Sequence, residues 1–194
     1  MTRRDSVRRT VTAALLAALI CAATLLELFP TPTGGYLHAG DGLVLLAGFL
    51  LGPVWGGLAA GIGSALADII LGYAYYAPGT LPVKAGMAVL AWFILQALSA
   101  TRMTRGGARV LAALCAEAWM VLGYFLYASL LLGKGAAALY SLPPNLLQGL
   151  FGGITGCLLD WLFQKNPALK KQIGGSYGLR THHKSDQNSD HGAS

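Results

Sequence analysis

Six ionisable residues interrupt the long apolar segments of this sequence, and they are the first residues whose chemistry needs an explanation. A charged side chain is costly in an apolar environment, so each is a candidate for function unless an opposite charge pairs with it. Lys84 is the one cation of the group and has two interpretations: an ion pair with Asp41 or Asp68 that fastens helices together, or a contact to a ligand. The six residues are Glu27, Asp41, Asp68, Lys84, Glu117 and Asp160.

The sequence lacks the residue patterns of common catalytic centres, so we expect a binding protein and not an enzyme. Gly133-Lys134 lacks the other residues of a GxxxxGK(S/T) phosphate loop, and no HExxH metalloprotease pattern occurs. Ser64 lies in an apolar segment, but no later apolar segment contains a histidine to act as its base. Asp41 and Asp68 are the remaining pair, and the local HAGDG lacks the first glycine of the GxGD pattern of intramembrane aspartyl proteases.

The cysteines and histidines favour neither a metal site nor a disulfide, and no cofactor is expected. The three cysteines lie singly in apolar segments without CxxC spacing, which is typical of small buried side chains. Three histidines lie in the polar C-terminal segment, where a sparse cluster favours a solvated tail. These residues are Cys21, Cys115, Cys157, His182, His183 and His191.

The composition indicates an integral membrane protein. Only 11% of the 194 residues are charged and 55% are hydrophobic, whereas a soluble globular chain carries about 25% charged residues. This balance excludes an ordinary soluble enzyme, and it excludes a disordered chain, which needs low hydrophobicity. No helical face interleaves basic and aromatic residues, so nucleic acid is not an expected partner. We expect a single multi-pass domain in the lipid bilayer of the cell membrane.

The apolar segments predict an all-α fold with six transmembrane helices. A bilayer core about 30 Å thick needs about 17–25 residues per helix, and the segment 41–73 is too long for one helix. Gly52-Pro53 divides it, because proline restricts the residue before it and lacks a backbone N–H. We expect a membrane domain over residues 1–165 and a polar, disordered cytoplasmic tail over 166–194. The predicted helices span residues 10–29, 41–52, 54–73, 81–100, 110–132 and 143–163.

The basic residues support an even number of spans. Twelve of the 14 Lys and Arg residues lie in the N-terminal segment, the 100–109 loop or the tail. Six spans place all three segments on one side, and basic loops accumulate in the cytoplasm, so both termini are expected there. A cleaved signal peptide is the alternative for the N-terminus, but its apolar core usually has about 7–15 residues and this run is longer.

This topology predicts a pocket toward the outer side of the membrane. Aromatic walls with a few fixed polar groups are typical of a site for a flat polar molecule. Asp160 lies at the inner end of the last helix, where we expect a solvated or paired interfacial charge, and Tyr73, Tyr75 and Tyr76 also fit an interfacial tyrosine belt. The candidate substrate-binding residues are Tyr36, His38, Asp41, Asp68, Lys84, Glu117, Tyr124, Asn145 and Gln148.

The first predicted helix carries two overlapping rows of small residues on adjacent faces. Small residues four apart let helices approach closely in lipid, so this helix is a candidate surface for docking a second membrane protein. The residues of the two rows are Ala13, Ala14, Ala17, Ala18 and Ala22.

With these helices placed, the chain resembles the substrate-binding S components of energy-coupling factor (ECF) vitamin transporters, nearest to the riboflavin-type subgroup. The resemblance is carried by the segment 31–90, and within it by GYLHAGD, GPVWG, GSALAD and a YAP followed by Lys84. The chain has Gly79 and Pro82 where relatives often have alanine and isoleucine.

The resemblance implies a function without catalysis. It implies high-affinity binding of a vitamin near the outer face, with riboflavin, pyridoxine or a pyrimidine as candidates. It also implies docking, through Ala14 and Ala18, to a transmembrane coupling (T) protein joined to two cytoplasmic ATPases. The alternative from a different class is a membrane scaffold or assembly subunit that binds no small molecule.

Overall fold

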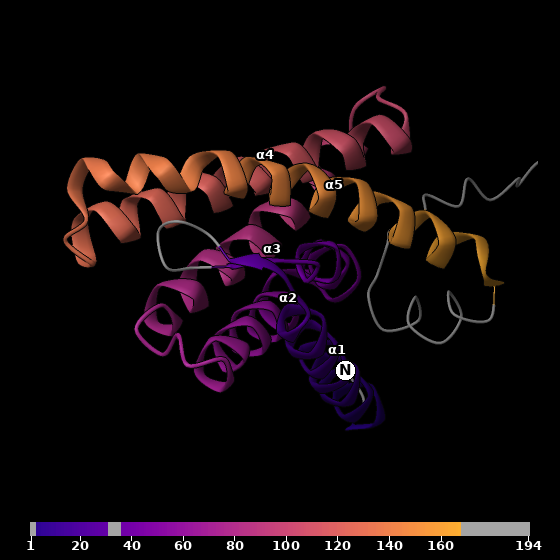
Figure 1. Cartoon of the computed structure of the whole chain (residues 1–194). Coiled ribbons are helices and arrows are strands. Elements are labelled where there is room, and N and C mark those ends of the chain that lie inside the picture. The colour runs from indigo at the N-terminus through magenta and orange to yellow at the C-terminus, as the bar shows by residue number, and fades with distance from the viewer. Residues whose placement is uncertain (1–2, 31–35, 168–194) are drawn as a thin grey trace, which may run out of the picture.

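The computed structural model describes residues 3–30 and 36–167, and within them helices dominate (Figure 1). The predicted tail lies outside the described residues from position 168 onward. In chain order the elements are α1 (Arg3–Leu25), β1 (Glu27–Pro30), β2 (Tyr36–His38), α2 (Asp41–Ile70), α3 (Ala77–Ser99), α4 (Arg105–Leu126), the π-helical η1 (Tyr127–Leu131), the 3-10 helix η2 (Gly135–Ser141) and α5 (Leu142–Lys165).

Five helical segments in the described part of the chain are long and apolar enough to cross a membrane. In Figure 1, α4 and α5 lie side by side along one side of the bundle, with α3 and α2 between them and α1. The prediction of a helical membrane protein is therefore confirmed. The number of crossings, six, stays a prediction, because five helical segments of the described chain meet the length and hydropathy requirement.

The helix α2 is broken where the sequence predicts a break. Gly52 has φ 78° and ψ −174°, a backbone conformation outside the helical region that glycine tolerates and that precedes Pro53. A Cβ atom on Gly56 would lie 2.6 Å from the carbonyl oxygen of Ala47, so the two sides of the break pack against each other. The chain therefore reverses, and α2 consists of two antiparallel legs, 41–51 and 53–70.

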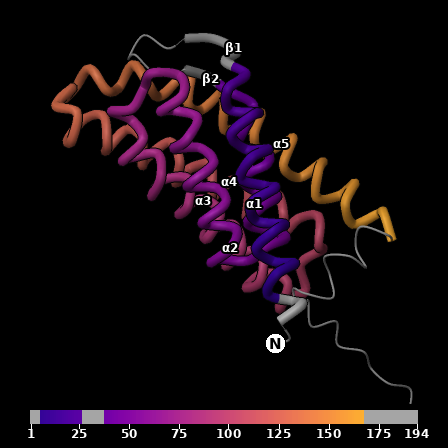
Figure 2. The backbone as a smooth tube through the Cα atoms, turned by 90° about the horizontal axis from the view of Figure 1, so that it is seen from below, coloured from indigo at the N-terminus to yellow at the C-terminus, as the bar shows by residue number. Residues whose placement is uncertain are grey.

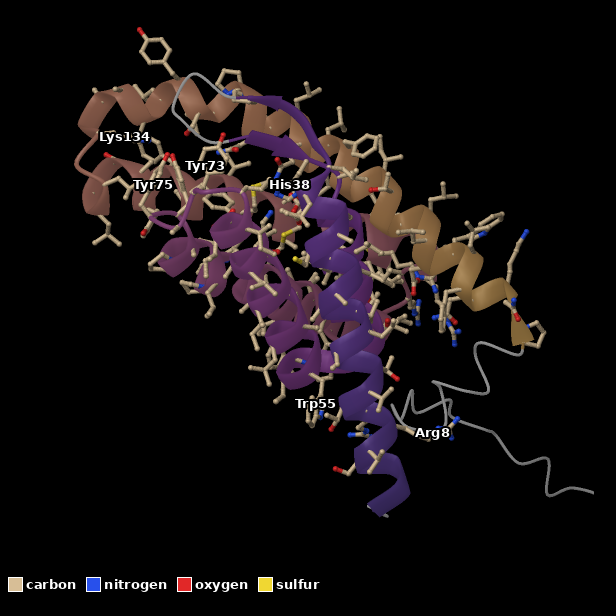
Figure 3. The ribbon with its side chains drawn as sticks, turned by 60° about the horizontal axis from the view of Figure 1, so that its bottom comes forward. Arg8, His38, Trp55, Tyr73, Tyr75 and Lys134 are labelled. Carbon is tan, nitrogen blue, oxygen red and sulfur yellow. The ribbon has the colours of Figure 1, made fainter. Side chains whose placement is uncertain are left out.

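The two legs run in opposite directions and differ in length. Figure 3 places Trp55, just after the break, at the end of the molecule near Arg8, whereas His38, Tyr73 and Tyr75 lie at the other end. At 1.5 Å per residue the first leg is about 16 Å long and the second about 27 Å. The first leg is thus much shorter than a bilayer core of about 30 Å, and Asp41 begins it well inside the bundle.

A short antiparallel hairpin joins α1 to α2, which corrects the predicted helix over 10–29. The helix ends at Leu25, and the strands pair Glu27 with His38 and Pro30 with Tyr36. Pro30 lacks the N–H that a helix needs, and strand pairing satisfies backbone groups that would otherwise be unpaired near lipid. Figure 2 shows α1 running along the bundle from the N-terminus, so the hairpin, which follows Leu25, begins at the opposite end of α1.

Three other helix boundaries differ from the predicted ones for local reasons. The helix α3 begins four residues before the predicted position 81, because Pro78 fits the first helical turn. The helix α4 begins at Arg105, where the Thr104 side chain accepts a hydrogen bond from the Gly107 N–H at 3.2 Å. The predicted 110–132 helix continues past Leu126 only as the π-helical turn η1.

Small residues bring the helices close enough to bury polar groups between them. A Cβ atom on Gly48 would lie 2.4 Å from the carbonyl oxygen of Ala88 in α3, and one on Gly61 would lie 2.8 Å from the Leu81 carbonyl oxygen. These contacts leave no room for a side chain, which is how helices pack in lipid. The second leg of α2 meets α1 in the same way, at Gly63.

Candidate functional site

The centre of the site is an ion pair between Asp41 and Lys84. Asp41 opens the first leg of α2, and Lys84 lies on α3, where it donates to the Oδ1 atom of Asp41. Lys84 is fully buried and Asp41 is 1% exposed. Of the two partners that the sequence allows for Lys84, Asp41 and Asp68, the structure selects Asp41.

Gln148 of α5 holds the second oxygen of Asp41. Its Nε2 atom donates to Asp41 Oδ2 at 2.8 Å, and its Oε1 atom accepts a hydrogen bond from the His38 backbone N–H at 3.2 Å. The predicted residues His38, Asp41, Lys84 and Gln148 thus form one buried group, here called the Asp41 network, that joins the hairpin to α2, α3 and α5.

His38 contributes its ring as well as its backbone to the network. The ring Nδ1 atom accepts from the Gly40 N–H at 3.0 Å, and the ring Nε2 atom lies 3.3 Å from Gln148 Nε2. Burial lowers the pKa of His38 to about 4; nearby Asp41 opposes this shift and Lys84 adds to it. His38 is therefore a neutral group at physiological pH.

Glu117 of α4 borders the network without joining its hydrogen bonds. Its side chain is 5% exposed, and neither carboxyl oxygen has a hydrogen-bond partner among the described residues. Two glycines of α5 make room for it: a Cβ on Gly152 would lie 2.5 Å from Glu117 Oε1 and 2.6 Å from the Asp41 Cβ, and one on Gly149 would lie 3.2 Å from the Glu117 Cβ. Glu117 and Asp41 are therefore near neighbours across α5.

Tyr124 closes the side of the network that faces α4. The Lys84 Nζ atom lies 5.4 Å from the centre of the Tyr124 ring, and the Tyr124 hydroxyl donates to Thr80 Oγ1 at 3.2 Å. Sequence reasoning missed Thr80, which is 2% exposed and lies one helical turn before Lys84. Its four-residue spacing from Lys84 is the signal that places both on one helix face.

The network forms because four elements bring polar residues to a common depth. Asp41 lies about 16 Å from the break in α2, and Glu117 about 18 Å from the start of α4, both measured from the Arg8 end at 1.5 Å per residue. Lys84 and Gln148 lie about 9–11 Å from the first residues of α3 and α5, which lie at the other end of the bundle. Because the first leg of α2 is short, Asp41 lies at about the same depth in the bundle as Glu117.

Above the network, tyrosines from two loops gather around Lys134. The Lys134 Nζ donates to the Tyr76 hydroxyl at 3.0 Å, and the Tyr127 hydroxyl donates to the Tyr75 carbonyl oxygen at 2.7 Å. Figure 3 shows Tyr73, Tyr75 and Lys134 at the same end of the bundle. The Tyr127 ring packs on Gly79, where an alanine Cβ would lie 2.5 Å from the ring. Gly79 therefore permits this contact between α3 and η1.

The remaining candidate residues are placed differently. Asp68 is 4% exposed and lies close enough to Tyr75 and Tyr124 to interact electrostatically with both. Asn145 is half-buried, and within the described residues no hydrogen bond joins it to the Asp41 network. The side chain of Tyr36 lies outside what the structure describes, so only its backbone pairing in β2 is known.

Asp160 lies at the other end of the bundle and pairs with Arg109 of α4, which confirms one of the two predicted environments for it. Asp160 is 1% exposed. Within the described residues, His, Cys, Asp and Glu side chains form no group of three that could hold a metal ion.

The two rows of alanines on α1 face different surroundings. Ala13 is buried, and the backbone of Ala17 meets Gly63 of α2. Ala14, Ala18 and Ala22 are exposed along the adjacent face. The first row therefore packs against the bundle, and the second row is available to lipid or to a second protein, so docking through α1 stays a prediction that is best tested on the second row.

Known proteins resemble this chain over nearly its whole length. The model of the family described as ECF-type riboflavin transporter, S component, matches residues 4–165. A relative from Pyrococcus woesei, described as an uncharacterized protein in the gap 3' region, is 36% identical over 157 residues, which cover 80% of this chain and 97% of the relative. This multi-pass membrane protein therefore belongs to the family of ECF-type riboflavin transporter S components.

Proposed function

We propose that this chain is the membrane-embedded, high-affinity vitamin-binding subunit of an ECF-type ABC importer. Its ligand is riboflavin or a pyridoxine-like or pyrimidine-like vitamin. A transmembrane coupling protein and two cytoplasmic ATPase subunits supply the energy, in agreement with a sequence that has no phosphate loop of its own. The family match over residues 4–165 supports this role.

The observation that carries the proposal is the Asp41 network. A bundle that only had to fold would bury apolar side chains, because buried ion pairs contribute little net stability. Here a histidine, a glutamine and an ion pair converge beneath a cluster of tyrosines. Such a mixture of aromatic walls and fixed polar groups is typical of small-molecule sites.

We propose six membrane crossings with both termini in the cytoplasm. The two legs of α2 count as two crossings in this topology, the first of them short. Arg102, Arg105 and Arg109 then lie in or next to one cytoplasmic loop, and Lys134 lies outside, as basic residues are usually distributed. The membrane domain covers residues 1–165, and the polar segment 166–194 is a cytoplasmic tail.

A panel of water-soluble vitamins tests the function directly. Purified protein in detergent is heated with riboflavin, pyridoxine, hydroxymethylpyrimidine, thiamine or biotin, and the unfolding midpoint is recorded. We expect one compound to stabilise the protein, by about 2.7 kcal/mol at a concentration of 100 times Kd. A folded sample that responds to none of them contradicts the proposal.

Paired tryptophan substitutions on α1 test the docking surface. Ala18→Trp adds bulk to the exposed row, so we expect vitamin uptake to fall while vitamin binding in detergent is unchanged. Ala17→Trp adds the same bulk against Gly63, so we expect it to lower stability and binding together. Equal loss of binding in both variants argues that α1 docks no partner through Ala18.

A scaffold without a ligand remains the second candidate, and one observation favours it. Lys84 is fully buried and paired, as expected of a residue that only fastens helices. This function predicts that no vitamin shifts the unfolding midpoint and that loss of Lys84 affects assembly alone.

A further inference from the structure

Four basic residues lie where the start of α4 meets the end of α5, at the opposite end of the bundle from Lys134. The segments 100–116 and 149–167 contain them and carry a single acidic residue, Asp160. Asp160 pairs with one of the four, Arg109, so the other three have no carboxyl group within these segments to compensate them. The four residues are Arg102, Arg105, Arg109 and Lys165.

The ion pair fixes which residues of the two helices lie level with each other. The helices α4 and α5 are antiparallel, and Arg109 of α4 meets Asp160 of α5. Arg105 precedes Arg109 by four residues, and Lys165 follows Asp160 by five. At 1.5 Å per residue both lie about 6–8 Å beyond the pair, so the two residues reach the same end of the bundle at a similar level.

These cations are available to a partner outside the bundle. The side chains of Arg102, Arg105 and Lys165 are exposed. Within the described residues, no ion pair or hydrogen bond joins the side chain of Arg102 or Arg105 to another group. The first turn of α4 is open as well, because a Cβ atom on Gly106 would have nothing within 4 Å of it. The partial positive charge of this helix N-terminus adds to the charge of the side chains.

The same end of α5 has the features of a membrane–water interface. The Lys165 Nζ atom lies 3.9 Å from the centre of the Trp161 ring, and that side chain is 45% exposed. Tryptophan is enriched at membrane interfaces, and a lysine near a helix end extends its ammonium group toward the headgroups. Farther from this end, both helices expose apolar side chains that suit acyl chains, among them Val110, Leu114, Ile154 and Leu158.

We propose that this basic surface, formed by Arg102, Arg105, Arg109 and Lys165, binds the headgroup of an anionic phospholipid whose acyl chains lie along α4 and α5. The planar N–H donors of arginine suit a phosphate group, and lysine adds a point charge. An acidic protein segment would meet the same cations, but it would leave the interfacial Trp161 and the apolar side chains beside it without a role. The inference is independent of the vitamin that the protein binds.

Binding of defined lipids to the purified protein tests the inference. The protein in a neutral detergent is titrated with dioleoylphosphatidylglycerol or dioleoylphosphatidylcholine, and native mass spectrometry counts the lipids that stay bound. We expect the wild type to bind the phosphatidylglycerol about tenfold or more tightly, because each cation near an anionic headgroup contributes about fivefold. Added salt weakens this preference, since exposed charges are screened. Inorganic phosphate at the same concentration does not displace the lipid, which distinguishes a lipid site from a site for free phosphate.

Matched variants link the preference to the basic surface. Arg102→Gln/Arg105→Gln removes two exposed cations, so we expect the affinity for phosphatidylglycerol to fall about 25-fold while the affinity for phosphatidylcholine is unchanged. Arg102→Lys/Arg105→Lys keeps both charges and retains most of the preference. The control is Arg8→Gln, which removes an exposed arginine from α1, on the other side of α2 and α3 (Figure 1). We expect this control to bind both lipids as the wild type does.

Four results overturn the inference, and the proposed function stands in each case. The first is equal affinity of the wild type for the two lipids, and the second is equal loss of affinity in Arg8→Gln and in Arg102→Gln/Arg105→Gln. The third is displacement of the lipid by inorganic phosphate. The fourth is a glutamine double variant that keeps its lipid affinity but no longer supports vitamin uptake, because this result assigns the basic surface to a protein partner.

Discussion

The Asp41–Lys84 and Arg109–Asp160 ion pairs lie at different depths in this bundle, and their surroundings differ in kind. Asp41 and Lys84 lie among the hairpin, α2, α3 and α5, and Lys84 is fully buried. Asp160 and Arg109 join only α5 to α4, and the Arg109 side chain is 15% exposed. Gln148 donates to Asp41 of the first pair and accepts from the His38 backbone N–H, whereas the second pair lies near the basic loop that follows α3.

The comparison shows which buried charge has a functional explanation. A pair near the end of a bundle can keep one charge in contact with water or lipid headgroups, so its desolvation cost is limited. The Asp41 network has no such relief, and it carries an additional unpaired carboxyl group at Glu117. This greater desolvation cost is what we expect of a binding site rather than of a structural pin.

The largest expected effect comes from removing the cation of the first pair. Lys84→Met leaves Asp41 buried without its charge partner, which costs about 3–5 kcal/mol of stability. The double variant Asp41→Asn/Lys84→Met removes the charge as well and should recover most of that loss. Unfolding midpoints of the single and double variants in detergent measure both, and a double variant as unstable as Lys84→Met contradicts the account.

Exchanging one cation for another sharpens the comparison. Lys84→Arg forces a larger, planar group into a fully buried position, so we expect a loss of about 1–3 kcal/mol. Arg109→Lys keeps the charge at a partly exposed position, so we expect a loss below about 1 kcal/mol. Equal losses measured by thermal unfolding would mean that the two pairs are equally confined.

Acid sensitivity should be found in the Asp41 network and not in the Arg109–Asp160 pair. Burial lowers the pKa of His38 to about 4 from its usual 6.5, so the unfolded chain takes up a proton first as the pH falls. Stability from this group is complete above pH 6.5 and is lost between pH 6.5 and 4, by about 1.4 kcal/mol per pH unit. Denaturation of wild type and His38→Gln from pH 7 to pH 5.5 tests this: the wild type should weaken more, and parallel curves count against it.

The smallest expected effect is on ligand affinity when the second pair is altered. Asp160→Asn removes a charge far from Glu117 and Lys84, so we expect no change in the Kd for the vitamin that binds the wild type. The measurement is a titration of both proteins under the same conditions. A weakened Kd would place the site at the Arg109 end of the bundle instead.

The composition and charge pattern were enough to predict a multi-pass helical membrane protein, because a chain with few charged residues cannot cover a water-facing surface. The break at Gly52-Pro53 was equally predictable, since proline and glycine act on the backbone locally. The ionisable residues Asp41, Lys84 and Glu117 were identifiable as candidates for the same reason: their cost in an apolar segment is visible without a fold.

Only the tertiary structure decided which of these candidates meet. Lys84 had two possible partners in the sequence, and the choice of Asp41 depends on how deep the short first leg of α2 begins. The hairpin after Leu25 likewise depends on pairing between residues 6 to 11 apart in the chain, which helix periodicity does not report. Both rows on α1 consist of alanines four residues apart, and packing of one row against Gly63 distinguishes it from the other. The reason is that residue spacing specifies a helix face but not the neighbour that covers it.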